Sequence, residues 1–138
     1  MSAKEPSRER KALVVDDDVH IRELLQTLLE LVGFEVHLAA DGIDVLSLHE
    51  RYDVILLDLK MPVFDGERLT DYWQMTDPDA LQRVIVLSGY SRVARAKQLP
   101  TFATIEKPFD HAELLRLVDA CLAQQRSAEK RNEQETDR

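Results

Sequence analysis

The sequence has one cysteine, four glycines and no long apolar run, and each shortage excludes a class of protein. A lone Cys121 cannot staple a fold through disulfides, and so few glycines exclude a collagen-like repeat. No stretch approaches the about 20 consecutive apolar residues that cross a bilayer, and the first residues lack the apolar middle of a secretory signal. We therefore expect a soluble, cytoplasmic protein whose Cys121 fills part of the core.

Basic residues are also scarce between the two ends of the chain. Residues 12–123 hold 10 Lys and Arg against 20 Asp and Glu, and the whole chain has a formal net charge of −8. Nucleic-acid binding needs clustered Lys and Arg, so we expect neither direct DNA binding nor membrane contact. The acidic balance favours solubility and leaves room for a bound cation or a basic partner.

The length and apolar content fit one globular domain. Polar, aperiodic segments at 1–10 and 125–138 predict an N-terminal tail and a C-terminal tail or helix extension. The domain is expected to span 11–124.

Within that span, short apolar runs alternate with stretches of helical spacing. The predicted strands are 11–16, 34–38, 54–57, 84–87 and 102–105. The predicted helices lie near 21–32, 43–48, 69–73, 93–99 and 110–122. Strict alternation is typical of an α/β fold with a doubly wound, five-stranded parallel sheet. The economical strand order is 2-1-3-4-5, which places a ligand crevice at the carboxyl ends of strands 1 and 3.

Polar side chains follow four of these strands. They are Asp16, Asp17 and Asp18 after the first strand, Asp58 after the third, Ser88 and Gly89 after the fourth, and Lys107 and Pro108 after the fifth. Each has an ordinary explanation as a helix cap, a turn or a surface residue, and Asp18 is expected to cap the first helix. Together they are better explained by a site, because all of them fall at the predicted ligand-binding edge.

Three carboxylates about 5 Å apart repel by roughly 3 kcal/mol per pair at an effective dielectric of 20. Such a cluster must be protonated, paired with Lys107 or bound to a hard cation such as Mg²⁺. The four histidines show no zinc-ligand spacing and are expected at the surface: His20, His37, His49 and His111. A carboxylate nucleophile beside a cation, an ammonium and a hydroxyl suits phosphoryl transfer. We therefore interpret Asp58 as a phosphoryl acceptor.

Four segments carry a family resemblance: LVVDDD (13–18), VILLDLKMPVFDG (54–66), VIVLSGY (84–90) and EKPF (106–109). In this order, and over about residues 10–124, the chain resembles the receiver domain of two-component response regulators, in particular a single-domain chemotaxis receiver. The resemblance implies a flavodoxin-like (βα)5 fold. It also implies that Asp58 takes a phosphoryl group from phosphohistidine.

The same resemblance implies a metal site and a switch. Asp17, Asp58 and the backbone carbonyl of Lys60 would hold Mg²⁺ or Mn²⁺, with Asp16 acting through water. The resemblance implies that Ser88 supplies the switch hydroxyl, that Gly89 beside it leaves the acceptor unobstructed, and that Lys107 reaches the phosphoryl group. It also implies that Pro62 and Gly66 belong to the loop after the acceptor and that Pro108 follows a cis peptide bond.

Two features depart from the family pattern. The aromatic residue expected three positions before Lys107 is replaced by Thr104, so the usual relay through that ring is absent. Phe102, with the same strand parity, and Tyr90 are candidate substitutes, although Phe102 better fits a core role. The segment between Ser88 and Lys107 is also short, which predicts a short fourth helix.

We expect a phospho-accepting signalling protein rather than an enzyme acting on a separate substrate, although it would catalyse its own phosphotransfer and dephosphorylation. Its expected partners are a histidine kinase or phosphotransfer protein and a downstream protein, with the chain a monomer or a phosphorylation-dependent dimer. Two alternatives remain: a receiver portion of a hybrid kinase or larger regulator, and a docking module that is never phosphorylated. A haloacid-dehalogenase-type hydrolase is disfavoured because Asp58-Leu59-Lys60 lacks the second aspartate of that motif.

Overall fold

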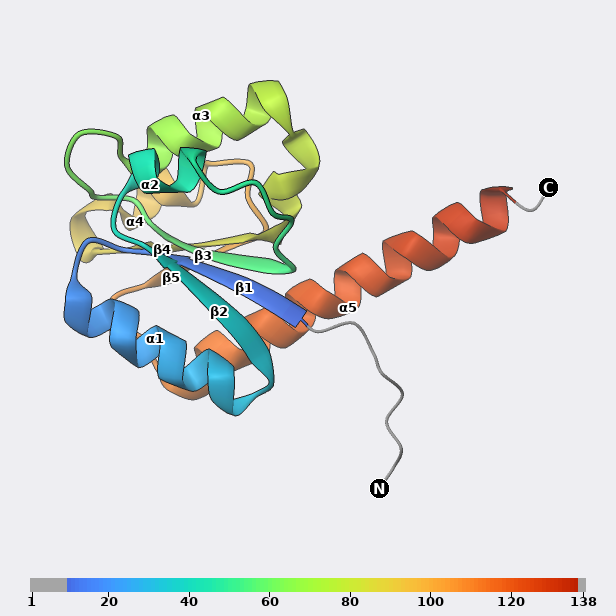
Figure 1. The fold of residues 1–138 in the computed structure, drawn as a ribbon, viewed down its shortest axis with the longest axis horizontal. Coiled ribbons are helices and arrows are strands. Elements are labelled where there is room, and N and C mark those ends of the chain that lie inside the picture. Colours follow the sequence, from blue (N-terminus) through green and yellow to red (C-terminus); the bar gives the residue numbers. More distant parts are fainter. Residues whose placement is uncertain (1–9, 137–138) are drawn as a thin grey trace.

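The computed structural model describes residues 10–136, which form a parallel sheet with helices on both faces (Figure 1). The strands are β1 (Arg10–Val15), β2 (Phe34–Ala39), β3 (Val54–Asp58), β4 (Val84–Ser88) and β5 (Ala103–Glu106). Each begins and ends within one residue of its predicted range. They lie in the order β2-β1-β3-β4-β5, and every neighbouring pair is parallel, which confirms the predicted fold class.

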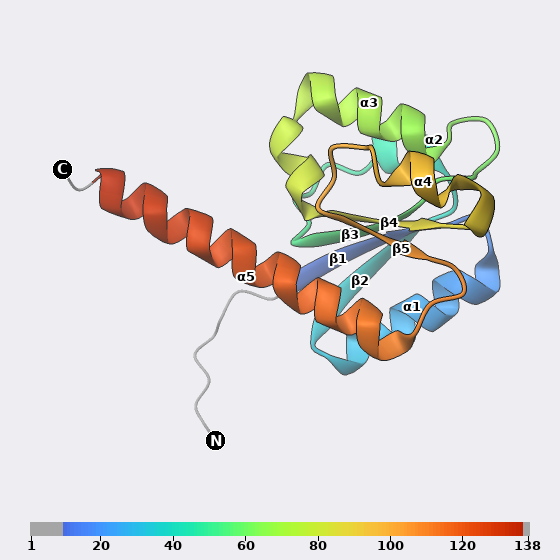
Figure 2. The same ribbon diagram turned by 180° about the vertical axis from the view of Figure 1, so that it is seen from behind.

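Five α-helices connect the described strands and follow the last one. They are α1 (Val19–Leu31), α2 (Gly42–Leu46), α3 (Gly66–Thr76), α4 (Val93–Ala96) and α5 (His111–Thr136). Helices α1 and α5 cover one face of the sheet, and α2, α3 and α4 cover the other (Figures 1 and 2). Two 3-10 helices, η1 (Pro78–Arg83) and η2 (Tyr90–Arg92), flank β4. No helix in the described range is long and apolar enough to cross a membrane.

The sheet separates two apolar clusters. On the α1–α5 face, Leu25, Leu29 and Leu114 pack against the sheet, together with Cys121, which is fully buried as predicted. On the opposite face, Trp73 is one of the side chains that cover the central strands. Strands β3 and β4 are buried along their whole length, because helices shield both of their faces.

Helix ends fix where the loops at the carboxyl edge of the sheet begin. The Asp18 carboxylate accepts hydrogen bonds from the backbone N–H groups of His20 and Ile21, which confirms it as the cap of α1. At the opposite edge of the sheet, where β2 begins, Gly33 follows α1 with φ +97°, a conformation that favours glycine. The Asp65 carboxylate caps α3 in the same way, through the N–H of Arg68. These caps hold the segments on either side of the sheet edge in place.

The structure corrects or extends three sequence expectations. The 3-10 helix η1 was not anticipated. His37 is not a simple surface residue: its Nδ1 lies 2.8 Å from the Tyr52 hydroxyl and its Nε2 lies 2.7 Å from Glu35 Oε2, because the segment after α2 folds against the edge strand β2. Helix α5 continues to Thr136 and extends away from the sheet (Figure 2), whereas most of the expected tail 1–10 lies outside the described residues.

Candidate functional site

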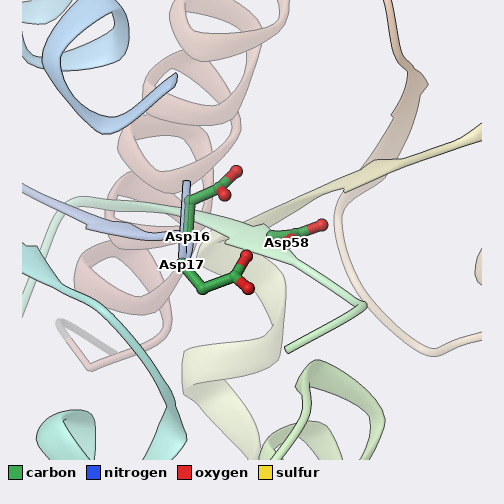
Figure 3. Close-up of side chains that lie close together, drawn as sticks. All are labelled: Asp16, Asp17 and Asp58. Carbon is green, nitrogen blue, oxygen red and sulfur yellow. The ribbon is translucent and has the colours of Figure 1, made fainter. Parts of the chain in front are cut away.

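Three carboxylates meet at the carboxyl edge of the sheet. Asp16 and Asp17 directly follow β1, and Asp58 is the last residue of β3 (Figure 3). One carboxylate oxygen from each lies within 4.8 Å of the other two. Asp16 and Asp58 are buried, whereas Asp17 is exposed. The cluster therefore has two carboxylates in the protein interior and one at the solvent boundary.

Strand pairing brings these residues together. Strands β1 and β3 are parallel neighbours in which Val15 lies opposite Leu57, so the residues that follow each strand emerge side by side. Asp16 continues the backbone pairing, since its N–H donates to the Ala39 carbonyl. Its side-chain Oδ1 accepts the N–H of Asp18 at 2.9 Å. The orientation of Asp16 is thus fixed by the turn that starts α1.

Lys107, which directly follows β5, lies against the cluster at the same edge of the sheet. Its Nζ is 3.0 Å from Asp16 Oδ2 and 3.3 Å from Asp58 Oδ1. The backbone N–H of Lys107 donates to the Ser88 carbonyl at 2.8 Å, which anchors it to the end of β4. The following bond, Lys107–Pro108, is cis, as the resemblance implied. The ammonium therefore bridges two carboxylates that are far apart in the sequence.

Burial and charge shift the ionisation of both partners. Burial, followed by the nearby charge of Asp16, raises the pKa of the Asp58 carboxyl from 3.8 to about 6, although Lys107 opposes the shift. Burial disfavours the charged form of Lys107, but the hydrogen bond to Asp16 and the charges of Asp58 and Asp16 outweigh it, and the pKa of the ammonium is raised. A single lysine thus compensates only part of the negative charge of the cluster.

Ser88 lies next to the acidic cluster at the end of β4. Strands β3 and β4 are parallel neighbours, with Asp58 opposite Leu87, and the Ser88 side chain is almost fully buried. Its hydroxyl donates to the carbonyl of Gly89 at 3.3 Å. A Cβ added to Gly89 would meet no atom within 4 Å, so packing in this conformation does not require glycine there.

The loop between β3 and α3 passes close to Asp58. A Cβ on Gly66 would lie 2.6 Å from the Asp58 carbonyl oxygen, so only glycine fits at this contact. The Phe64 N–H donates to the Pro62 carbonyl at 2.7 Å, closing a γ-turn around Val63, whose φ is +67°. The Lys60 N–H reaches Asp58 Oδ1 at 3.4 Å. The loop is therefore tightly constrained beside the cluster.

Thr104 and its candidate substitutes lie apart from one another. The Thr104 hydroxyl donates to the Ala96 carbonyl of α4 at 3.3 Å. Phe102 packs with the apolar cluster on the α1–α5 face, which confirms its core role. The expectation that it shares a strand face with Thr104 was wrong, because β5 begins only at Ala103 and the alternation does not extend to Phe102. Tyr90 is 83% exposed.

One supporting residue was missed by the sequence reasoning. Arg22 lies one turn into α1, and its guanidinium NH1 donates to the backbone carbonyl of Asp16 at 2.7 Å. No motif marks this arginine. It adds a positive charge beside the first strand end and holds the backbone from which the acidic pair projects.

The donor set fits a hard divalent cation. Carboxylate oxygens are the ligands that Mg²⁺ and Mn²⁺ prefer, and Mg²⁺ keeps several waters, which the exposed position of Asp17 allows. Neither histidine nor cysteine takes part in the cluster, so a zinc site is not favoured. The partial compensation by Lys107 leaves a negative charge that a cation would balance.

Comparison with known proteins agrees with this geometry. A sequence model described as "response regulator receiver domain" matches residues 12–119. The chain is 33% identical over 109 residues to sporulation initiation phosphotransferase F of Bacillus subtilis, covering 75% of this chain and 86% of that protein. It is 36% identical over 114 residues to a transcriptional regulatory protein CpxR homolog of Haemophilus influenzae, covering 81% of this chain and 50% of that relative. The chain thus spans about half the length of that relative.

Solved structures have a similar fold. The receiver domain of a Pseudomonas aeruginosa sensor histidine kinase, which has a magnesium ion coordinated in its active-site cleft, is 26% identical with a TM-score of 0.73, covering 84% of this chain and 99% of that one. The receiver domain of Francisella response regulator 1452 is 29% identical with a TM-score of 0.75, covering 84% and 98%. With its family match, strand order and acidic edge, the chain belongs to the response regulator receiver domain family.

Proposed function

We propose that the chain accepts a phosphoryl group on Asp58 from a phosphohistidine of a histidine kinase or phosphotransfer protein, and that this modification changes its binding to a downstream protein. The observation that carries the proposal is the contact of one lysine with two buried carboxylates beside an exposed third, at the end of adjacent parallel strands. The family to which the chain belongs supports it. The metal-binding and phosphoryl-binding roles expected of the neighbouring residues are part of the same proposal.

In the proposed reaction, an Asp58 carboxylate oxygen attacks the phosphorus of phosphohistidine. An O–P bond forms, the P–N bond breaks, and the departing imidazole nitrogen keeps the electron pair and takes a proton. Asp17, Asp58 and the Lys60 carbonyl would hold Mg²⁺ or Mn²⁺, with Asp16 acting through water, and the ion when bound neutralises charge on the phosphoryl oxygens.

Lys107 and Ser88 act on the product of this step. The Lys107 ammonium, already 3.3 Å from Asp58 Oδ1, pairs with a phosphoryl oxygen. The Ser88 hydroxyl turns from the Gly89 carbonyl to donate to another. Phosphorylation adds a charge of about −1.5 to −2 at an acidic edge, so these compensating groups are what convert the modification into a conformational shift.

The test is intact mass after incubation with acetyl phosphate, with and without Mg²⁺, for the wild type and Asp58→Asn. We expect a single phosphoryl adduct that needs both Mg²⁺ and Asp58. If no adduct forms with acetyl phosphate or with phosphohistidine donors, the proposal is wrong, and the chain is then better interpreted as a docking module.

Lys107→Ala separates uptake of the phosphoryl group from the response. We expect the variant to gain some adduct, because Asp58 is retained, but to lose the dependence of partner binding on phosphorylation. Partner affinity that still changes with phosphorylation as in the wild type would contradict the role given to Lys107. Lys130→Ala, an exposed lysine in the extension of α5 far along the chain from the acidic cluster, is the control.

A further inference from the structure

Helix α4 has few contacts that hold it in place. It comprises only Val93–Ala96, and of these residues only Ala96 is buried. Neither η2 nor α4 begins with a side-chain cap. Helices this short are unstable without tertiary contacts. The position of α4 therefore depends on the side-chain interactions that reach it from α3 and β5.

The first interaction is an ion pair between α4 and α3. Arg95 Nε lies 3.1 Å from Glu67 Oε2, and the second guanidinium nitrogen lies 3.1 Å from Oε1, so both carboxylate oxygens are engaged. Such two-point pairs have a defined geometry that a lysine could not reproduce. Glu67 is 31% exposed and Arg95 is 61% exposed, which limits the strength of the pair through solvent screening.

The second interaction comes from β5. The Thr104 hydroxyl donates to the carbonyl of Ala96, the last residue of α4. The same carbonyl also accepts the Leu99 N–H at 3.1 Å, so the Thr104 hydroxyl is a second donor that ties the end of α4 to β5. At 3.3 Å this bond is long and weaker than the ion pair. The two interactions nevertheless restrain the same four-residue helix from two different elements, α3 and β5.

Both partners of the ion pair connect to the acidic cluster through the backbone. Glu67 follows Gly66, whose N–H donates to the Leu59 carbonyl and where an added Cβ would lie 2.6 Å from the Asp58 carbonyl oxygen. Arg95 follows Ser88 by seven residues through η2. The ion pair thus joins the segment after the proposed acceptor to the segment after the proposed switch hydroxyl. Movement of Ser88 toward a phosphoryl group on Asp58 would pull on the segment that carries Arg95.

We propose that the Arg95–Glu67 ion pair and the Thr104–Ala96 hydrogen bond form a clasp that holds α4 in its unmodified position and opposes the rearrangement driven by phosphorylation. This inference rests on the proposed function. A contact present only in the unmodified conformation lowers the apparent affinity for any group that favours the other conformation. Removing the clasp therefore strengthens binding at Asp58, although neither contact touches Asp58.

The experiment has two measurements. Calorimetry gives the affinity for beryllium trifluoride, a phosphoryl mimic, in the presence of Mg²⁺. Hydrogen exchange follows the backbone N–H groups of residues 92–99. The variants are Glu67→Gln and Thr104→Val, which keep side-chain size. The control is Glu50→Gln, which breaks an exposed ion pair with Lys11 away from the acidic edge. Thermal unfolding of each variant verifies that it is folded.

For Glu67→Gln we expect about two- to fivefold faster exchange in α4 and about two- to fivefold tighter binding of the mimic, the range that an exposed ion pair supplies. Thr104→Val should show a smaller change in the same direction, and the control should match the wild type. With the mimic bound, wild type and variants should exchange at the same rate in α4, because the clasp is already open.

Wild-type affinity for the mimic in both variants would overturn the clasp, whether or not α4 exchange increases. Weaker binding would overturn it as well, since it would mean that these contacts support the modified conformation. Failure of the proposed function looks different: the wild type itself would then bind no mimic and form no adduct with acetyl phosphate.

Discussion

At the scale of single residues, the ionised Asp58 carboxylate lowers the stability of the fold. Its carboxyl is buried beside Asp16, and its pKa is raised to about 6 despite the contact with Lys107. Because the folded state holds the proton more tightly than the unfolded state, ionisation of Asp58 destabilises the fold. The charge on which the proposed phosphoryl transfer depends is therefore maintained at the expense of stability.

Asp58→Asn should stabilise the protein at pH 8 in EDTA by about 2 kcal/mol, less than the full shift implies because Lys107 also loses a partner. The stability that a raised pKa contributes is present below the unfolded value of 3.8 and is lost as the pH rises through about 6. The difference between variant and wild type should therefore shrink between pH 6 and pH 4. Urea unfolding across this range measures it, with the exposed Asp119→Asn as the control. A difference independent of pH would contradict this account.

Val63 is a second residue under local constraint. It has φ +67°, which strains the backbone of a β-branched residue. Its side chain is 79% exposed, so no burial of apolar surface compensates for this strain.

Val63→Gly should raise the free energy of unfolding by about 1 kcal/mol, because relief of strain exceeds the added flexibility of the unfolded chain. Chemical denaturation is the measurement. The matched control is Val32→Gly, since Val32 is a partly exposed valine with φ −105°. This substitution should lower the free energy of unfolding. Equal losses in both variants would show that φ at Val63 carries no strain.

At the scale of elements, the start of α2 packs tightly against the β3–α3 loop. The Gly42 N–H donates to the Phe64 carbonyl, and a Cβ at Gly42 would lie 2.3 Å from Phe64 Cδ1 and 2.6 Å from that carbonyl oxygen. The loop beside Asp58 therefore rests on a helix that contributes no residue to the acidic cluster.

Gly42→Ala should lower the free energy of unfolding by about 2 kcal/mol, as overpacking against backbone does. It should also slow adduct formation at Asp58, since the loop has to shift. Gly89→Ala, where a Cβ meets nothing within 4 Å, should change stability by less than about 0.5 kcal/mol. Denaturant titration and intact mass test the pair, and similar stabilities would refute the packing argument.

At the scale of the whole molecule, α5 serves the core only along its first half. Leu114, Val118 and Cys121 are buried against the sheet, and the Gln125 side chain donates to the Asp53 carbonyl at 2.8 Å. Beyond Gln125, the described side chains up to Asn132 are exposed, apart from a partly exposed Ala128.

Removal of residues 127–138 should therefore change the free energy of unfolding by less than about 0.5 kcal/mol, because the side chains described from 127 to 132 are exposed apart from Ala128. Gln125→Ala should cost about 1 kcal/mol, the usual value of a hydrogen bond with a partly buried partner. Thermal and urea unfolding compare the two. A larger loss on truncation would mean that the helix extension contributes to the fold.

Much of this protein could be predicted from local pattern. Apolar runs and helical spacing located all five strands to within one residue, because strand and helix burial impose different periods along the chain. Parallel pairing then predicted that residues after β1, β3, β4 and β5 would share one edge. Asp18 and Gly33 were predictable as helix ends, since capping depends only on neighbouring residues.

Contacts between side chains that are distant in the sequence could not be predicted and are seen only in the folded structure. The bridge from Lys107 to both Asp16 and Asp58, the His37–Tyr52 contact and the Arg95–Glu67 ion pair depend on how elements pack, and no local spacing encodes them. Phe102 shows the same limit, because its face depends on where β5 begins. Local sequence pattern was enough to place the acidic, hydroxyl and ammonium groups at one edge of the sheet, because it depends only on neighbouring residues. Which of these charges meet, and which side chains contact α4, depends on the packing of helices and loops that are far apart in the chain.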